Sequence, residues 1–139
     1  MSGGEQDRIV WLDVAEVVAL HEAIMRRLGE SPEPLRDADA LEAAIMRPRM
    51  AAHYAGGDLC DFAARLAVGI SQAQAFLDGN KRTAYAALEV FLYVNGVRLK
   101  VEGLTVAQRL EAIATANDRE AATVALAAWL RSRGEPISE

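Results

Sequence analysis

Residues 74–96 read QAFLDGNKRTAYAALEVFLYVNG, a short loop followed by a helix-like segment. From about residue 80 to residue 94, apolar side chains recur with the spacing of an amphipathic helix. Asn95-Gly96 is a typical helix end. Charged and polar residues gather just before the helix and in its first turn. We therefore predict a loop over 75–79 that leads into a helix, with the chemistry at the junction.

The rest of the chain predicts more helices of the same kind. Helical spacing is expected over residues 13–28, 37–48, 58–74, 105–116 and 117–133. Two pairs resemble capping boxes, Asp13 with Glu16 and Thr105 with Gln108. Gly134 and Pro136 are read as the stop of the last helix.

Two segments break this pattern. Residues 47–57 (RPRMAAHYAGG) have no clear period and end in Gly-Gly, so we expect a mobile loop or a short hairpin there. Residues 97–103 (VRLKVEG) alternate apolar and polar side chains, which is typical of a short strand. The sequence thus predicts an all-α, compact bundle of about six helices with at most one short hairpin or strand.

Composition and charge restrict the class of protein. The 139 residues are 52% hydrophobic and 25% charged, as in a single globular domain over 1–139, and residues 1–10 are expected to be a flexible N-terminus. The net charge of −5 argues against direct nucleic-acid binding. The single cysteine, Cys60, excludes an intrachain disulfide. Without a membrane-spanning apolar run or a signal-peptide core, we expect a cytoplasmic protein with no membrane contact.

The junction at residues 78–82 has the chemistry of a phosphate site. The first turn of a helix has free N–H groups and partial positive charge. Gly79 allows close approach, Asn80 can donate a hydrogen bond, and Arg82 offers a planar fork of donors beside Lys81. Asp78 would repel a phosphate unless a cation lay between them, which implies Mg²⁺. The alternative is an ordinary aspartate cap followed by two solvated cations.

The string DGNKRTA at 78–84, with Phe91-Leu92 and Asn95-Gly96 after it, resembles a family signature. The signature is H-x-F-x-D-G-N-K-R-T-A, that of the Fic/Doc family on its Doc (death-on-curing toxin) branch. Other matching positions are Trp11-Leu12, Leu20-His21, Leu35-Arg36-Asp37, Leu41-Glu42-Ala43-Ala44, Arg47-Pro48, Tyr54, Asp58-Leu59 and Ala63-Ala64. The resemblance therefore covers roughly residues 11–96.

The resemblance implies a Fic fold that uses ATP with Mg²⁺. Carried over by position, Asp78 would hold the metal, and Gly79, Asn80, Lys81 and Arg82 would bind the nucleotide, with Arg82 also catalytic. Phe76 would pack the loop into the core. Doc-type members resemble protein kinases that phosphorylate a threonine of elongation factor Tu, and a Phd-type antitoxin restrains them.

Within the wider family most members transfer AMP instead. Lys81 stands where AMP-transferring members have glycine, and Thr83-Ala84 follow where those members tend to have a further arginine. A bulky cation at residue 81 should favour an inverted nucleotide that presents its γ-phosphate. Both features favour a kinase over an AMP transferase.

The chain departs from the family at its general base. The motif histidine is Gln74 here, and the usual proline after it is Ala75. An amide is not basic, and loss of a general base costs about 10²–10⁴-fold in rate. We therefore expect an impaired Doc-like toxin. Three explanations stay open: a natural pseudoenzyme that keeps nucleotide or antitoxin binding, a chain inactivated for expression, or a base supplied by another residue. The paired change at 74 and 75 favours the first over the second.

Two histidines and two arginines complete the candidates. His21 is expected to have a packing role on the first helix. His53 lies in the segment that corresponds to the family's target-docking flap, and is expected to be a solvated loop residue, with substrate or antitoxin contact or a replacement base as alternatives. Arg47 and Arg49 flank Pro48 and could meet an acidic partner, or simply be exposed.

Overall fold

A computed structural model describes residues 8–137 of the chain. Its elements are α2 (Val14–Arg27), α3 (Ala38–Ala55), α4 (Leu59–Ala73), α5 (Asn80–Val94), β1 (Val97–Leu99), α6 (Gly103–Ala114), α7 (Arg119–Arg133) and β2 (Gly134–Pro136). Six helices and one two-stranded sheet in this part of the chain confirm the predicted all-α bundle. Of the expected flexible N-terminus, residues 1–7 lie outside the described residues. Val10 exchanges two hydrogen bonds of 2.9 Å with the Asn95 side chain.

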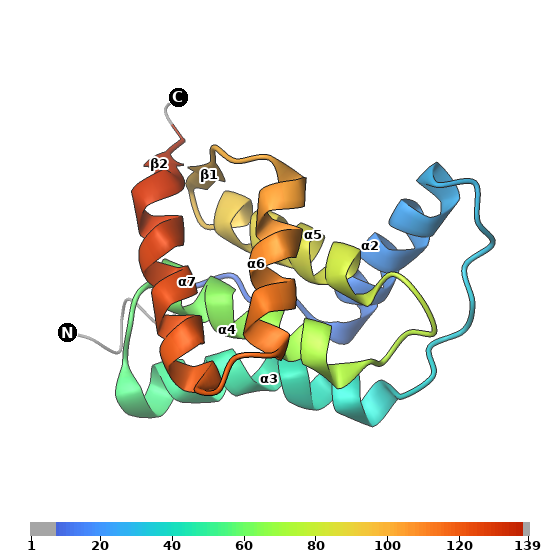
Figure 1. Cartoon of the computed structure of the whole chain (residues 1–139), viewed down its shortest axis with the longest axis horizontal. Coiled ribbons are helices and arrows are strands. Elements are labelled where there is room, and N and C mark those ends of the chain that lie inside the picture. The colour runs from blue at the N-terminus through green and yellow to red at the C-terminus, as the bar shows by residue number, and fades with distance from the viewer. Residues whose placement is uncertain (1–7, 138–139) are drawn as a thin grey trace.

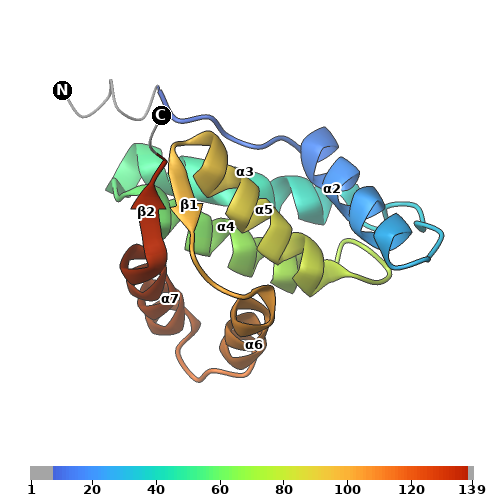
Figure 2. The same ribbon diagram turned by 90° about the horizontal axis from the view of Figure 1, so that it is seen from above.

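Helix α4 is the centre of the bundle. It packs against α3, α5 and α7, while α2 lies against α5 (Figure 1). Figure 2 shows α6 and α7 next to each other on one side of the α3–α4–α5 group. Small side chains let α3 and α4 approach closely: a Cβ added at Gly69 would lie 3.3 Å from the Cβ of Ala44. None of the described helices is long and apolar enough to cross a membrane.

Aspartate caps begin four of the helices. Each accepts a hydrogen bond from the backbone N–H three residues later, and the four are Asp13, Asp37, Asp58 and Asp118. The predicted capping box of Asp13 and Glu16 is confirmed. The predicted box at Thr105 is wrong, because α6 already begins at Gly103 and its N-cap is Glu102. Helix α5 begins differently, since its N-cap is Gly79 and no side chain caps it.

The prediction that a helix stops at Pro48 and a loop fills 47–57 is wrong. Helix α3 continues through the proline to Ala55. Proline removes one helical hydrogen bond and crowds the carbonyl four residues back. That carbonyl belongs to Ala44 and lies beside Gly69, where there is no side chain to obstruct it. Burial of Pro48 and Ala52 continues the apolar face of the helix, so tertiary packing outweighs the local cost.

The strand expected within 97–103 is confirmed over Val97–Leu99. Its partner was not expected, because Gly134 and Pro136 indicated only a helix stop. The two strands pair antiparallel, with Val97 opposite Pro136 and Leu99 opposite Gly134. A three-residue strand of Gly-Glu-Pro has no alternation to detect, and its pairing with β1 depends on where α7 ends.

An arginine on α7 holds the start of α4. Arg131 Nε lies 2.7 Å from Asp58 Oδ2, and its Nη2 lies 2.8 Å from Asp61 Oδ1. Burial raises the pKa of Asp58, but hydrogen bonds from Arg131 and from the Asp61 backbone outweigh burial and keep this pKa below its usual value. These contacts join the capping box of α4 to α7, the C-terminal helix.

Acid should therefore weaken the fold through Asp58. A carboxyl whose pKa is lowered by folding stabilises the protein above its unfolded pKa of about 3.9, and the effect is lost as the pH falls through the folded pKa. We expect Arg131→Gln to lower the free energy of unfolding by about 0.5–1 kcal/mol near pH 7 and by less below about pH 3. Thermal melts across this pH range measure it. Arg98→Gln is the control, since Arg98 has no side-chain ion pair with a described residue. An equal loss at both pH values would contradict the prediction.

Candidate functional site

The loop between α4 and α5 is held against α2. The Phe76 ring is buried and stacks on the ring of His21, with centroids 3.9 Å apart and planes 12° apart. His21 Nε2 donates to the Asp78 carbonyl oxygen at 2.8 Å, so this nitrogen carries the hydrogen. His21 is 2% exposed, which confirms the packing role expected for it. The sequence did not indicate that its partner would be the loop itself.

The Asn80 side chain closes this loop from inside. Its Oδ1 accepts from the Phe76 N–H at 3.1 Å, and its Nδ2 donates to the Phe76 carbonyl at 2.8 Å. The side chain is buried. We expected this amide to contact a phosphate, whereas in the structure both of its polar atoms bind main chain. Asn80 therefore shapes the loop, and the donors that face outward at the junction come from elsewhere.

Gly79 sets the angle at which the loop enters α5. Its φ is +82°, in the region that favours glycine, and an added Cβ would lie 3.0 Å from Met25 Sδ on α2. Asp78 does not cap α5, because its Oδ1 turns to the Gly79 N–H at 2.8 Å. The reading of Asp78 as an ordinary cap is thus wrong. Within the described chain, the N–H groups of Asn80, Lys81 and Arg82 have no acceptor.

The two cations of the first turn differ in their surroundings. Lys81 Nζ lies 3.6 Å from Glu111 Oε2 on α6, so its charge is partly compensated. The Arg82 side chain is exposed and has neither an ion pair nor a hydrogen bond with any residue from 8 to 137. A guanidinium without a partner, in the same helical turn as three free N–H groups, is an arrangement that can hold phosphate oxygens.

Asp78 fits a metal that arrives with its ligand. Residues 8–137 contain no group of three or more histidine, cysteine or acidic side chains that could hold a metal ion. Mg²⁺, however, is commonly held by one or two carboxylates together with substrate phosphates and water. Asp78 is exposed at the N-terminal end of α5 and suits that arrangement, whereas a closed protein metal site does not fit these residues.

Gln74 ends α4 and has no basic atom to offer. It has φ 52° and ψ 38°, a left-handed conformation, and its Nε2 donates back to the Ser71 carbonyl at 3.0 Å. The Arg36 guanidinium donates to the Gln74 carbonyl, and the Ala75 carbonyl accepts from the Arg36 N–H at 2.8 Å. The backbone at the position of the family's base is therefore held firmly, while the side chain there is a neutral amide.

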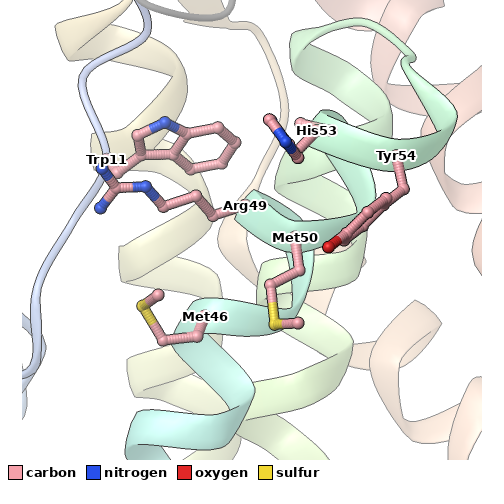
Figure 3. A pocket seen from close by; sticks show the side chains of 7 residues that line it. Trp11, Met46, Arg49, Met50, His53 and Tyr54 are labelled. Carbon is pink, nitrogen blue, oxygen red and sulfur yellow. The ribbon is translucent and has the colours of Figure 1, made fainter.

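Neither histidine can replace the missing base. His21 is buried and bound to the Asp78 carbonyl. His53 is on the last turn of α3, which lies near the start of α4, while Gln74 follows the other end of that 15-residue helix (Figure 1). At 1.5 Å per residue the two ends are about 20 Å apart. His53 is exposed and lines a different cavity of about 420 Å³ with Trp11, Met46, Arg49, Met50, Ala52 and Tyr54 (Figure 3).

Comparison with known proteins gives two matches. The model of the Fic/DOC family matches residues 11–92. A curated protein named Toxin Doc, from Mycolicibacterium smegmatis (strain ATCC 700084 / mc(2)155), is 42% identical over 72 residues, which cover 49% of this chain and 54% of that protein. The chain thus spans about half the length of this curated relative. The family match runs from the residues before α2 into α5 and includes the loop–helix junction.

Proposed function

Because this chain belongs to the Fic/DOC family, we propose that it is a Doc-like toxin of a toxin–antitoxin pair. Its junction between α4 and α5 binds ATP with Mg²⁺, and its scaffold is that of a kinase for a protein hydroxyl. The target is part of the translation machinery, of the elongation factor Tu kind, and a Phd-like antitoxin restrains the toxin. Gln74 impairs the chemical step.

One observation carries this proposal: α5 begins without a side-chain cap, next to an unpaired arginine. The three N–H groups of its first turn and the Arg82 guanidinium are free of partners within the described part of the chain. In four other helices the N-cap is an aspartate, whose side chain accepts a hydrogen bond from an N–H of the first turn. A polyphosphate satisfies the open donors and gains from the partial positive charge of the helix start.

Each residue of the junction has a role in this proposal. The free N–H groups and Arg82 hold phosphate oxygens in line for attack, and Asp78 holds the Mg²⁺. The metal supplies charge neutralisation on the transferring phosphate. Lys81, drawn toward Glu111, occupies space that AMP-transferring members leave open, which supports transfer of the γ-phosphate. Gln74 can orient a target hydroxyl but cannot accept its proton.

One observation favours a second role, that of a binding module without catalysis. The Gln74 amide is turned back onto the Ser71 carbonyl of its own helix, while the phosphate-binding groups of α5 remain in place. A chain that keeps ligand affinity after losing its base would show this combination. Such a pseudoenzyme would still bind ATP or an antitoxin peptide. An assay of phosphoryl transfer therefore distinguishes the two roles, whereas an assay of ligand binding does not.

Substitution of Arg82 tests the nucleotide site. We expect Arg82→Ala to weaken binding of ATP with Mg²⁺ by about 10- to 100-fold, since one charge-assisted contact contributes about 1.5–3 kcal/mol. Isothermal titration calorimetry measures the change, with Arg98→Ala as the matched control on β1. Either of two results would refute the site: no heat from the unmodified chain with ATP and Mg²⁺, or equal affinity in R82A and R98A.

A further inference from the structure

Arginines from three different helices line one cavity of about 240 Å³ between α3, α4 and α7. They are Arg47 on α3, Arg65 on α4 and Arg119 on α7, and the other polar lining residues are Gln72, Glu120 and Thr123. The cavity shares no residue with the loop–helix junction at 74–82. We propose that it is a second anion site, which binds a small phosphate monoester.

Most of the positive charge in this cavity has no compensation. Glu120 neutralises Arg65 through two hydrogen bonds of 2.8 Å, and this ion pair lowers the pKa of Glu120. The Arg47 side chain has no ion pair or hydrogen bond with any other described residue. The Arg119 guanidinium reaches only the Ala114 carbonyl, at 3.5 Å. Two of the three arginines that line this cavity therefore have no acidic partner, in a chain whose net charge is −5.

The unbroken course of α3 places Arg47 there. Arg47 and Arg49 flank the buried Pro48, and two residues of helix separate their directions by about 200°. Arg47 lines the arginine cavity, whereas Arg49 lines the cavity that contains Trp11 and His53 (Figure 3). If residues 47–57 were a loop, no rigid element would hold Arg47 beside α4 and α7.

The residues that line the cavity indicate which ligand it binds. Two guanidinium groups without an acidic partner match a phosphate monoester, which carries a charge of about −1.5 to −2 at pH 7 and accepts bidentate hydrogen bonds. The Thr123 hydroxyl is used by its own helix, since it donates to the Arg119 carbonyl at 2.7 Å, which leaves Gln72 as the neutral donor. Ala51, Val68 and Gly69 add an apolar wall for a short carbon chain.

The size of the cavity suits a ligand smaller than a nucleotide. Cavities for drug-sized ligands are about 300–1,000 Å³, and this one is smaller, at about 240 Å³. The ligand is therefore a phosphorylated compound of a few carbon atoms. This second site does not depend on ATP binding at α5. An experiment can therefore refute either proposal without refuting the other.

Titration with glycerol phosphate, with inorganic phosphate alongside, tests the second site. In amide NMR spectra of the full chain we expect shifts at Gly69 and Gln72 and none at Gly79. Arg47→Gln and Arg119→Gln should each weaken binding by about 10- to 100-fold, and the matched control Arg49→Gln should not change it. Glu120→Gln removes the competing carboxylate and should tighten binding about 3–10-fold.

Any one of three results would contradict the second site. They are no binding of either probe at millimolar concentration, equal weakening by R49Q and R47Q, or shifts centred on Gly79 that vanish in Arg82→Ala. The last would mean that the probes occupy the α5 site. Far-ultraviolet circular dichroism of each variant checks that the helices are intact. If Arg82→Ala abolishes ATP binding and leaves glycerol phosphate binding unchanged, the two sites are separate, as proposed.

Discussion

Replacing Gln74 with histidine is expected to raise the rate of transfer from ATP to a target protein by about 10²–10⁴-fold. Imidazole accepts a hydroxyl proton near pH 7, and the amide now present does not. The measurement is label from γ-labelled ATP on the target protein, with growth arrest on induced expression as the cellular readout. Label from α-labelled ATP would instead identify AMP transfer.

The structure explains why one substitution should suffice. The carbonyl groups of Gln74 and Ala75 are held by the side chain and backbone of Arg36, so the new side chain starts from a fixed point. Histidine is among the residues that tolerate a left-handed backbone, which Gln74 adopts. The lost Gln74–Ser71 hydrogen bond is one neutral, part-buried contact and costs about 1 kcal/mol.

Gln72→His is the matched control for this experiment. It places an imidazole two residues earlier on α4, where Gln72 lines the arginine cavity and not the junction. We expect no gain in rate from it. If Gln74→His brings no gain while ATP still binds, the amide at residue 74 is not what limits transfer, and the role of a binding module is favoured. If the unmodified chain already arrests growth, our interpretation of residue 74 is wrong.

Phe76→Ala should cost about 3–5 kcal/mol of folding free energy, the largest stability effect we expect from a single substitution in the loop. The ring is 1% exposed, stacks on His21 and lies beneath a loop whose main chain is bonded to Asn80. Its removal leaves a cavity where α2 meets the loop, and a weaker loop should also bind ATP less well. Urea unfolding followed by circular dichroism measures the loss.

Leu77→Ala is the neighbouring control. Leu77 follows Phe76 directly but is 60% exposed, so its truncation should change stability by less than about 0.5 kcal/mol. Comparable losses in both variants would mean that the loop is not anchored by the Phe76 ring. In that case the support for Asp78 would have to come from the His21 hydrogen bond alone.

Rules that depend on neighbouring residues account for most of the helix positions that were predicted from the sequence. Helical spacing and an aspartate before the first turn depend on residues three or four apart, and α2, α4, α5 and α7 begin within a residue or two of where the spacing placed them. The same rules failed where burial outweighed them. Pro48 ends a helix in isolation, but here it is buried, and the Ala44 carbonyl four residues back lies beside Gly69 of α4, which has no side chain to obstruct it.

The candidate site shows the same division. The residue types at 78–82 indicated phosphate and metal chemistry, and Gln74 indicated an absent base, because these inferences depend on functional groups and their order in the chain. The use of Asn80 inside the loop and the support of Asp78 by His21 could not be predicted. Both depend on partners that only folding brings within 3.1 Å, and in the second case the partners are 57 residues apart.

The amino-acid order alone was thus enough for the helical class and the position of the loop–helix junction, because both depend on neighbouring residues. The tertiary structure decided which polar groups stay free. It buried His21 beneath the loop and bound the Asn80 side chain to the Phe76 main chain. It left the Arg82 side chain without a partner among the described residues, and it brought Arg47, Arg65 and Arg119 to one cavity. Whether a polar group is free for a ligand depends on every neighbour it meets in three dimensions, and residue spacing does not specify those neighbours.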